Sequence, residues 1–565
     1  MFAMYSYQTR PPTNPITIRR GRIAAAILVL GLLVVVGRLI QLQIWEHGAW
    51  LERAKASQER TIEIPPQRGT IYDRNGTILA TDVKAMAIAV DGINITQPEA
   101  AIEILHDALQ LRRDELRGKV YRESYFTWID RSVDFDVAQR IEQRTHEAGV
   151  YGLVFIETWK RSYPQGELAS NLIGFVGIDG LGLEGLELAF DEHLQGNPSV
   201  LRVLEGADGR TYDIEIVASG SPGLPLTLTL DAGIQFICEE EISVGVTGFR
   251  AKGGMILVMD PRTGEILAMA QDKRYDLNSF WTSNEESRRN LAVTHLFEPG
   301  SIFKVFTGLA ALDHKVVNPT DAFDGNDGID VSGHVMHNAD NISYGTVAFA
   351  QIIEDSINTG MIRVAQQLGE ERFHAFLQVL GFGEITGVKL PGEEPGILRP
   401  VAQWSGLALA ATSIGQSVAV TGIQLIRALA VVAGDGTLPA PQITTLDAVH
   451  DGVRAAVCSA ESCTTMRSLM RRVVETGTGT LAAIEDYTIA GKTGTAQKAI
   501  PGRGYVSGLY TSLFAGMVPA AAPEIVCLVV LDEVGTVPVS GGYTAGQIFR
   551  RATERILNDL RIPPG

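Results

Sequence analysis

A long apolar run near the N-terminus places the strongest constraint on how this chain can fold. Residues 23–37 contain no charged side chain. Further apolar residues extend the run: Leu39, Ile40, Leu42 and Ile44. An α-helix needs about 20 mostly apolar residues to cross a bilayer. The run therefore predicts one transmembrane helix over residues 23–45.

The residues before this run indicate its orientation. Four arginines precede it without any acidic residue: Arg10, Arg19, Arg20 and Arg22. Basic residues accumulate on the cytoplasmic side of a membrane helix, so residues 1–22 form a predicted cytoplasmic tail. Everything after Trp45 is then expected outside the inner (cytoplasmic) membrane, in a protein that crosses it once. A cleaved signal peptide is the alternative, but no small-x-small cleavage site follows the run.

The composition excludes several classes of protein. With 565 residues, the chain is long enough for about two to four domains. Its formal net charge of −17 argues against a nucleic-acid-binding protein. The cysteines form neither a Cys-x-x-Cys pair nor a metal cluster, so we expect no metal and no cofactor. Cys458 and Cys463 are close enough in sequence to pair, whereas Cys238 and Cys527 lie in apolar patterns and are expected to be buried.

The pattern of the chain changes near residue 220. Residues 46–220 mix short strand-like segments with amphipathic helices, and the turn-rich stretch 219–225 (SGSPGLP) marks a predicted boundary. The part that follows, 221–565, begins and ends with strand-like runs and is mainly helical between them. Its predicted strands are 254–260, 265–270, 487–490, 512–518 and 525–531, its helical part is 301–470, and a last helix covers 545–560. Strands at both ends of a helical segment predict one antiparallel sheet covered by helices, an α+β domain.

Within this region a serine and a lysine lie three residues apart. Ser301 and Lys304 follow Pro299-Gly300, which ends the preceding element, and apolar spacing after them predicts a helix. Residues i and i+3 share one face of a helix, so the Lys304 amine can reach the Ser301 hydroxyl and act as its base. Free N–H groups at a helix start can also stabilise an oxyanion. Alone, such a tetrapeptide is more often ordinary helix surface.

Two further short motifs follow along the chain. Ser356-Ile357-Asn358 offers a second hydroxyl and an amide that could relay protons and hold a carbonyl, although alone it is more often a helix cap or a turn. Lys492-Thr493-Gly494-Thr495 follows a strand-like segment. There a cation and two hydroxyls lie on one strand edge, together with a backbone that glycine leaves uncovered by a side chain. This combination suits the binding of a carboxylate beside an acyl group.

Three other motif matches fail on their context. Gly491-Lys492-Thr493 lacks the glycine that a phosphate-binding loop needs five residues earlier, because that position is Asp486. The sequence GLGLEG at 180–185 matches a dinucleotide fingerprint, but no series of βαβ units surrounds it. His334 and His337 have the spacing of metal ligands without a third ligand nearby.

In this order, Ser-x-x-Lys, Ser-x-Asn and Lys-Thr-Gly are far more specific together than each is alone. With them the chain resembles the penicillin-binding proteins, specifically the class B, monofunctional transpeptidases. The resemblance covers nearly everything from residue 20 onward. Further segments carry it: RGTIYDRNG at 68–76, RSYP at 161–164, GLEGLE at 182–187, EPGS at 298–301 and GKTGTAQ at 491–497. The departures are Ile302, where the family often has threonine, and GQIF at 546–549 in place of Ala-Pro-Val-Phe.

This resemblance implies a fold and a reaction. It implies a serine-transpeptidase/β-lactamase-like domain over 221–565, a non-catalytic pedestal of the dimerisation type over 46–220, and membrane attachment through 23–45. The implied substrate is the D-Ala-D-Ala end of a peptidoglycan stem peptide. A serine acyl-enzyme would crosslink it to a neighbouring strand, and β-lactams would acylate the same serine.

The resemblance also assigns roles to the motif residues. Ser301 is the expected nucleophile, Lys304 its base, and Ser356 a proton relay toward the leaving D-alanine. Asn358 is expected to orient the peptide and Lys304. Four residues on one strand edge complete the expected site, Lys492 within the catalytic set and the others in substrate binding: Lys492, Thr493, Gly494 and Thr495. Backbone amides of Ser301 and Thr495 would form the oxyanion hole.

The cellular role follows from a further similarity. Residues 473–480 (VVETGTGT) resemble the division-type enzymes, so septal synthesis during cell division is the prediction and an elongation-type enzyme is the close alternative. Expected partners are a polytopic membrane glycan polymerase and other division proteins. A β-lactam sensor would need several membrane spans and a cytoplasmic effector domain. A β-lactamase would not need the pedestal, and an inactive scaffold would be expected to lose Ser301, Lys304 or Lys492.

Overall fold

The computed structural model describes residues 15–50, 59–124, 126–205, 211–447, 455–500 and 504–564. The chain divides into two compact units, one of Met1–Pro65 with Pro198–Gly220 and the other of Pro66–Asn197 with Ser221–Gly565. Residues 1–14, most of the predicted cytoplasmic tail, lie outside the described residues.

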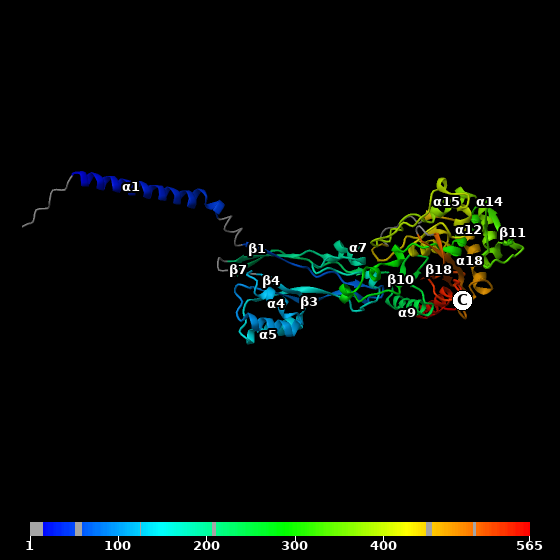
Figure 1. The fold of residues 1–565 in the computed structure, drawn as a ribbon, viewed down its shortest axis with the longest axis horizontal. Helices are drawn as coiled ribbons and strands as arrows, with labels where there is room; N and C mark the ends of the chain where they lie inside the picture. The colour runs from blue at the N-terminus through cyan, green and yellow to red at the C-terminus, as the bar shows by residue number, and fades with distance from the viewer. Residues whose placement is uncertain are drawn as a thin grey trace, which may run out of the picture. The chain divides into compact units, whose positions relative to one another are not determined.

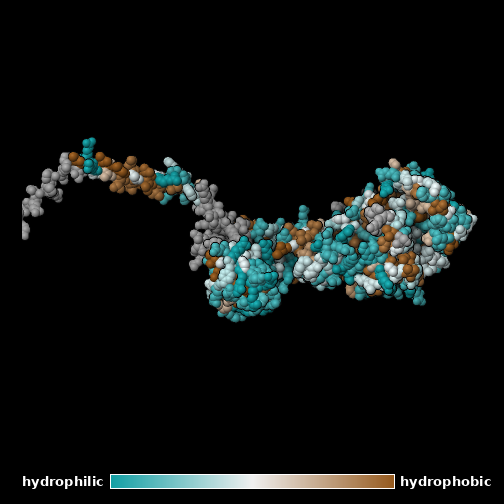
Figure 2. Space-filling model, in the orientation of Figure 1, coloured by the Kyte–Doolittle hydropathy of each residue, from teal (hydrophilic) through white to brown (hydrophobic). Residues whose placement is uncertain are grey.

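The first unit contains the predicted membrane helix. Helix α1 (Pro15–Ile40) continues into the π-helix Gln41–Trp45, so the helix begins before the predicted residue 23. Within the described part of the chain, Ile18–Trp45 is the one helix long and apolar enough to cross a membrane. Figure 2 shows apolar side chains along most of its length. The same unit holds an antiparallel sheet in the order β1 (Glu59–Ile64), β6 (Ser199–Glu205) and β7 (Thr211–Ala218).

The second unit begins with a sheet organised around the long strand β3. Strand β3 (Ile78–Val90) pairs antiparallel with β4 (Thr127–Asp134), β5 (Leu153–Ser162) and β2 (Ile71–Tyr72), and β2 pairs in parallel with β8 (Leu226–Thr227). Three helices supply apolar side chains to its core: α3 (Pro98–Leu109), α4 (Arg113–Val120) and α5 (Phe135–Glu147). This part of the fold therefore has a core of its own.

A buried ion cluster joins distant parts of this region. Arg68 contacts Glu187 at 2.6 Å and Asp191 at 2.7 Å. Arg161 contacts Glu187 at 2.7 Å and Asp82 at 3.1 Å. The Glu187 side chain is fully buried, so its charge is compensated by two arginines rather than by water. Three segments that carry the family resemblance, at 68, 161 and 187, thus meet in one cluster.

The second sheet of this unit is the five-stranded antiparallel sheet predicted from the two ends of residues 221–565. Its order is β10 (Ile266–Gln271), β9 (Gly253–Met259), β19 (Ile525–Asp532), β18 (Gly504–Val518) and β17 (Ala490–Ile500). Strands β9 and β10 are buried along their whole length because both faces of the sheet are covered. Helices α9 (Ala232–Gly248) and α19 (Ala545–Asp559) pack together on one face, as Figure 1 shows for α9 beside the red C-terminal segment.

Helices from the middle of the chain form the layer on the other face. They are α12 (Lys304–Asp313), α13 (Phe349–Glu354), α14 (Asn358–Leu368), α15 (Glu370–Val379), α16 (Ala408–Ser413), α17 (Gly422–Ala433) and α18 (Ala460–Glu475). Short strand pairs decorate this layer: β11 (Ala322–Asp324) with β14 (Thr346–Ala348), β12 (Ile329–Val331) with β13 (His334–Met336), and β15 (Thr437–Leu438) with β16 (Ala455–Ala456). Short helices occupy the remaining connections: α6 (Ser170–Ile173), α7 (Gly185–Ala189), α8 (Asp191–Gln195), α10 (Glu285–Arg288) and α11 (Leu291–Thr294). The predicted α+β class is confirmed.

Two predicted elements differ in detail. The strand expected at 487–490 begins only at Ala490, because residues 484–487 form a turn in which the Tyr487 amide donates a hydrogen bond to the Ile484 carbonyl at 3.2 Å. The helix expected from Ser301 starts as the 3₁₀ turn Gly300–Phe303, and α12 proper begins at Lys304.

Candidate active site

The turn that carries Ser301 is pressed against strand β17. Gly300 has φ +53, and a Cβ atom there would lie 2.8 Å from the Thr495 carbonyl oxygen. Its amide also donates a hydrogen bond to the Gly415 carbonyl at 3.1 Å. A Cβ atom at Gly494, on the strand, would in turn lie 2.9 Å from the Pro299 carbonyl oxygen. Glycines on both sides therefore let the Ser301 backbone approach the strand edge at Gly494 and Thr495.

Lys304 points into the protein and is fully buried. Its amine contacts the Asn358 Oδ1 atom at 2.7 Å, the Ser356 hydroxyl at 3.2 Å, and the Ser356 carbonyl oxygen. Burial, and then the charge of Lys492, hold the pKa of Lys304 well below its usual value, although the charge of Asp340 acts in the opposite direction. A neutral amine that donates its two N–H groups to the Asn358 and Ser356 carbonyl oxygens keeps its lone pair available, so Lys304 is suited to accept a proton.

Ser356 and Asn358 lie where helix α13 ends and α14 begins. Ser356 adopts φ +58, an uncommon conformation for a residue other than glycine. Asn358 is the first residue of α14, and its Nδ2 atom donates a hydrogen bond to the His337 carbonyl oxygen at 2.8 Å. The amide oxygen of Asn358 is thereby aimed at Lys304.

Lys492 approaches the same group from strand β17. Its amine lies 2.9 Å from the Ser356 hydroxyl, and the side chain is fully buried. Burial lowers the pKa of Lys492 to about 7. The structure thus brings Lys304, Ser356, Asn358 and Lys492 together from three separate segments, with the Ser301 turn beside them.

The other residues of the Lys-Thr-Gly strand contact neighbouring segments through their hydroxyls. The Thr493 hydroxyl lies 2.8 Å from that of Thr478, and the Thr495 hydroxyl accepts a hydrogen bond from the Gly541 amide at 3.0 Å. A Cβ atom at Gly541 would lie 2.5 Å from the Gly494 carbonyl oxygen. The strand edge is therefore packed on one side by the loop after β19.

Sequence reasoning missed a residue that holds the start of helix α14, Asn338. Asn338 is buried and uses four hydrogen bonds, two to carbonyl oxygens of Gly325 and Ile342 and two from the amide and hydroxyl of Thr359. It ties the segment after β13 to the start of α14. No sequence pattern pointed to it, since its effect on Asn358 passes through backbone groups.

The rejected motifs have structural explanations. His337 contacts Asp327 at 2.8 Å through its ring, and its carbonyl oxygen serves Asn358. Among the described residues no group of three potential metal ligands occurs. The glycine-rich stretch at 180–185 leads into α7, and the Gly180 carbonyl oxygen accepts a hydrogen bond from Arg68 of the ion cluster at 3.2 Å.

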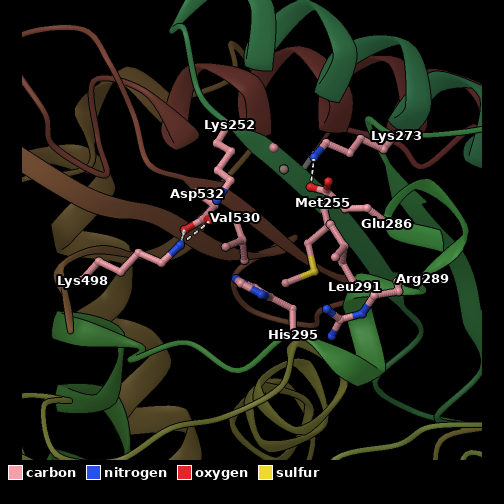
Figure 3. A pocket seen from close by; sticks show the side chains of 12 residues that line it. Lys252, Met255, Lys273, Glu286, Arg289, Leu291, His295, Lys498, Val530 and Asp532 are labelled. Carbon is pink, nitrogen blue, oxygen red and sulfur yellow. Dashed lines mark hydrogen bonds and ion pairs between the residues drawn. The ribbon is translucent and has the colours of Figure 1, made fainter. Parts of the chain in front are cut away.

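A separate cavity of ≈ 180 Å³ lies at the start of β9 and the end of β19. Figure 3 shows two of its lysines paired, Lys498 with Asp532 and Lys273 with Glu286, and the third, Lys252, contacts Glu533 at 3.3 Å. His295 lines it as well. The cavity contains none of the predicted site residues, and carboxylates compensate its lysines.

The family model of the penicillin binding protein transpeptidase domain matches residues 254–554, and that of the penicillin-binding protein dimerisation domain matches residues 63–228. The chain belongs to the penicillin-binding proteins. This penicillin-binding protein is a serine-type D-Ala-D-Ala transpeptidase of class B.

Individual relatives match the sequence of this penicillin-binding protein along nearly its whole length. It is 32% identical to the probable peptidoglycan D,D-transpeptidase PenA of Neisseria meningitidis, over 96% of this chain and 94% of the relative. It is 28% identical to the peptidoglycan D,D-transpeptidase FtsI of Escherichia coli, over 95% and 91%. The solved structure of penicillin binding protein 3 from Mycobacterium tuberculosis, complexed with aztreonam, is 27% identical and matches with a TM-score of 0.68, over 89% of this chain and 98% of that chain.

Proposed function

We propose that this penicillin-binding protein crosslinks stem peptides in septal peptidoglycan through an acyl-enzyme on Ser301. The observation that carries the proposal is the convergence of two buried amines, those of Lys304 and Lys492, on the Ser356 hydroxyl beside the Ser301 turn. Such a site supplies a neutral base for a serine and a cation for a carboxylate.

In the proposed reaction Lys304 accepts the Ser301 proton as the hydroxyl attacks the penultimate D-Ala carbonyl. The C–N bond to the terminal D-alanine breaks, and Ser356 passes a proton to the leaving amine. Backbone amides of Ser301 and Thr495 hold the oxyanion, each donor worth about 3 kcal/mol in comparable enzymes. An amine of a neighbouring strand then attacks the ester, which forms the crosslink and releases Ser301.

Substrate binding is assigned to strand β17. Lys492, Thr493 and Thr495 would bind the terminal carboxylate, and Gly494 would leave space for the peptide against the strand. β-Lactams would acylate Ser301 in the same way, since they carry a reactive acyl group beside a carboxylate. Asn358 would orient both the peptide and Lys304.

The cellular setting is also a proposal. Helix 23–45 would anchor the protein in the inner membrane with residues 1–22 in the cytoplasm, a pedestal over 46–220 and a catalytic domain over 221–565 outside. The pedestal and the membrane helix would contact a polytopic glycan polymerase and other division proteins. The resemblance of residues 473–480 to division-type enzymes supports the septal role over an elongation role.

Labelling with a fluorescent penicillin tests the nucleophile. Wild type and a Ser405→Ala control, altered at an exposed serine, should label, and Ser301→Ala should not. Label that persists on Ser301→Ala would refute the assignment. Depletion in cells separates the two roles, because loss of a septal enzyme gives filaments and loss of an elongation enzyme gives rounded cells.

A further inference from the structure

Two cysteine side chains touch at the start of helix α18. The Sγ atoms of Cys458 and Cys463 lie 3.3 Å apart, and the two thiols are not bonded. A disulfide bond measures about 2.05 Å, so a small rotation of the side chains would close the gap. Cys463 is fully buried, whereas Cys458 is partly exposed.

The start of the helix explains why these side chains meet. Ser459 caps α18, because its hydroxyl accepts a hydrogen bond from the Ser462 amide at 3.2 Å. Cys458 is then the residue before the cap, and Cys463 is the fourth residue of the helix. Side chains at these two positions pack together in many helices and fix the angle at which the chain enters. Helix capping therefore orients both thiols toward each other before any bond forms.

We propose that Cys458 and Cys463 form a disulfide bond in the mature protein. The inference rests on the proposed location of this domain outside the inner membrane, where disulfides form and persist. The bond would make the contact at the start of α18 covalent.

The oxidant is a thiol–disulfide oxidoreductase of that compartment. The Cys458 thiolate attacks a sulfur of the oxidoreductase disulfide, which gives a mixed disulfide and a first free thiol on the oxidoreductase. Cys463 then attacks the Cys458 sulfur, which releases the second thiol. Two cysteine thiols are oxidised, one disulfide is reduced, and both protons end on the oxidoreductase. The partly exposed Cys458 is the point of entry.

The environment of Cys458 indicates that its oxidation needs a catalyst. The hydrogen bond with Cys463, together with burial, raises the pKa of the Cys458 thiol. Few thiolates then exist in the folded protein at neutral pH, and uncatalysed exchange is slow. Oxidation is accordingly expected to depend on the oxidoreductase, which reaches the partly exposed Cys458.

The other cysteines provide an internal control. Cys238 on α9 and Cys527 on β19 are both buried in the core between the sheet and its outer helices. Burial raises the pKa of Cys527 to about 12. Neither thiol is accessible to an oxidoreductase in the folded protein, so both should remain reduced.

The bond should affect stability and leave the chemistry unchanged. Helix α18 has 16 residues and is therefore about 24 Å long. The cysteines lie at its first turns, whereas Thr478, which contacts Thr493, lies just beyond its other end. Closing a ring of this size should raise the Tm by roughly 2–4 °C.

Peptide mapping of the full-length protein tests the inference. Protein is purified from membranes without reductant, and one portion is unfolded in iodoacetamide and digested. A second, folded portion of the same preparation is labelled with fluorescent penicillin. We expect a linked peptide containing Cys458 and Cys463, alkylated Cys238 and Cys527, and a Tm that reductant lowers in wild type but not in Cys458→Ser. Alkylation of all four cysteines would overturn the inference. The penicillin label reports on the proposed function separately, because it does not depend on these thiols.

Discussion

The amines of Lys304 and Lys492 contact the same hydroxyl, that of Ser356, at 3.2 and 2.9 Å. Two lysines this close, both fully buried, cannot both remain charged at low cost. The pKa of each is lowered, by burial in both cases and also by the charge of Lys492 in the case of Lys304. The site therefore favours a neutral Lys304 amine as base and a Lys492 amine that is charged below its pKa of about 7.

This pairing predicts a pH dependence of acylation. Neutral Lys304 is required as base, so the rate should rise with pH through its lowered pKa. Charged Lys492 is required to bind a carboxylate, so the acylation efficiency of the free enzyme should fall above its pKa of about 7. The acylation efficiency for a penicillin, measured by stopped flow from pH 5 to pH 9, should give a bell-shaped pH profile. This range covers about two pH units on either side of the pKa of Lys492.

Lys492→Arg is the matched control, because a guanidinium stays charged over this range. The descending limb above neutral pH should disappear in this variant while the ascending limb remains. If both limbs persist unchanged, Lys492 does not set the upper limit.

Asn338→Ala should slow acylation without removing any group that touches substrate. It deletes the hydrogen bonds that hold Thr359 and the segment after β13, so Asn358 and Lys304 lose their fixed geometry. We expect a loss of about 10-fold in the acylation rate constant, with little change in the dissociation constant of the penicillin. Asn338→Asp keeps the acceptor of the Thr359 bonds and should lie between alanine and wild type. A wild-type acylation rate in Asn338→Ala would refute this positioning role.

Gly300→Ala should reduce both stability and acylation. The new Cβ atom would lie 2.8 Å from the Thr495 carbonyl oxygen and would push the Ser301 turn away from β17. Gly333→Ala is the control, since Gly333 also has a positive φ (+83) but has open space around its Cβ position. Both variants should lose about 1 kcal/mol from backbone strain. Only Gly300→Ala should label more slowly with fluorescent penicillin, and equal labelling would show that the contact is tolerated.

Glu187→Gln should destabilise the region around β3 strongly. It leaves Arg68 and Arg161 buried without their shared carboxylate, which typically costs about 3–5 kcal/mol. Thermal unfolding should show a large drop in Tm, whereas Glu192→Gln, at an exposed position, should change it little. Similar values for the two variants would mean that Asp82 and Asp191 suffice for the arginines.

The sheet and its covering helices could be predicted from the sequence because apolar runs mark both ends of the region. The i, i+3 spacing of Ser301 and Lys304 correctly placed them at a helix start. It did not show that Ser301 lies in a 3₁₀ turn and that Lys304 points toward Ser356 and Asn358. That contact joins residues more than 50 positions apart, which no local pattern contains.

The groups that position Asn358 could not be predicted from the sequence for a different reason. The His337 carbonyl that holds Asn358 is a backbone atom, and every residue has one. Asn338 resembles any loop asparagine until its burial is known. Positioning by backbone groups leaves no signature in residue types, so only the folded chain reveals it.

The pairing of β2 with β8 has a consequence for the order in which the protein is built. Strand β2 is among the first parts of the second unit to emerge from the ribosome, yet its parallel partner β8 begins only at Leu226. Asp73 likewise accepts a hydrogen bond from the amide of Ala232, 159 residues later. During synthesis the early strand must therefore wait, with one edge open, until the intervening chain has been made. The first residues to arrive are among the last to reach their native contacts.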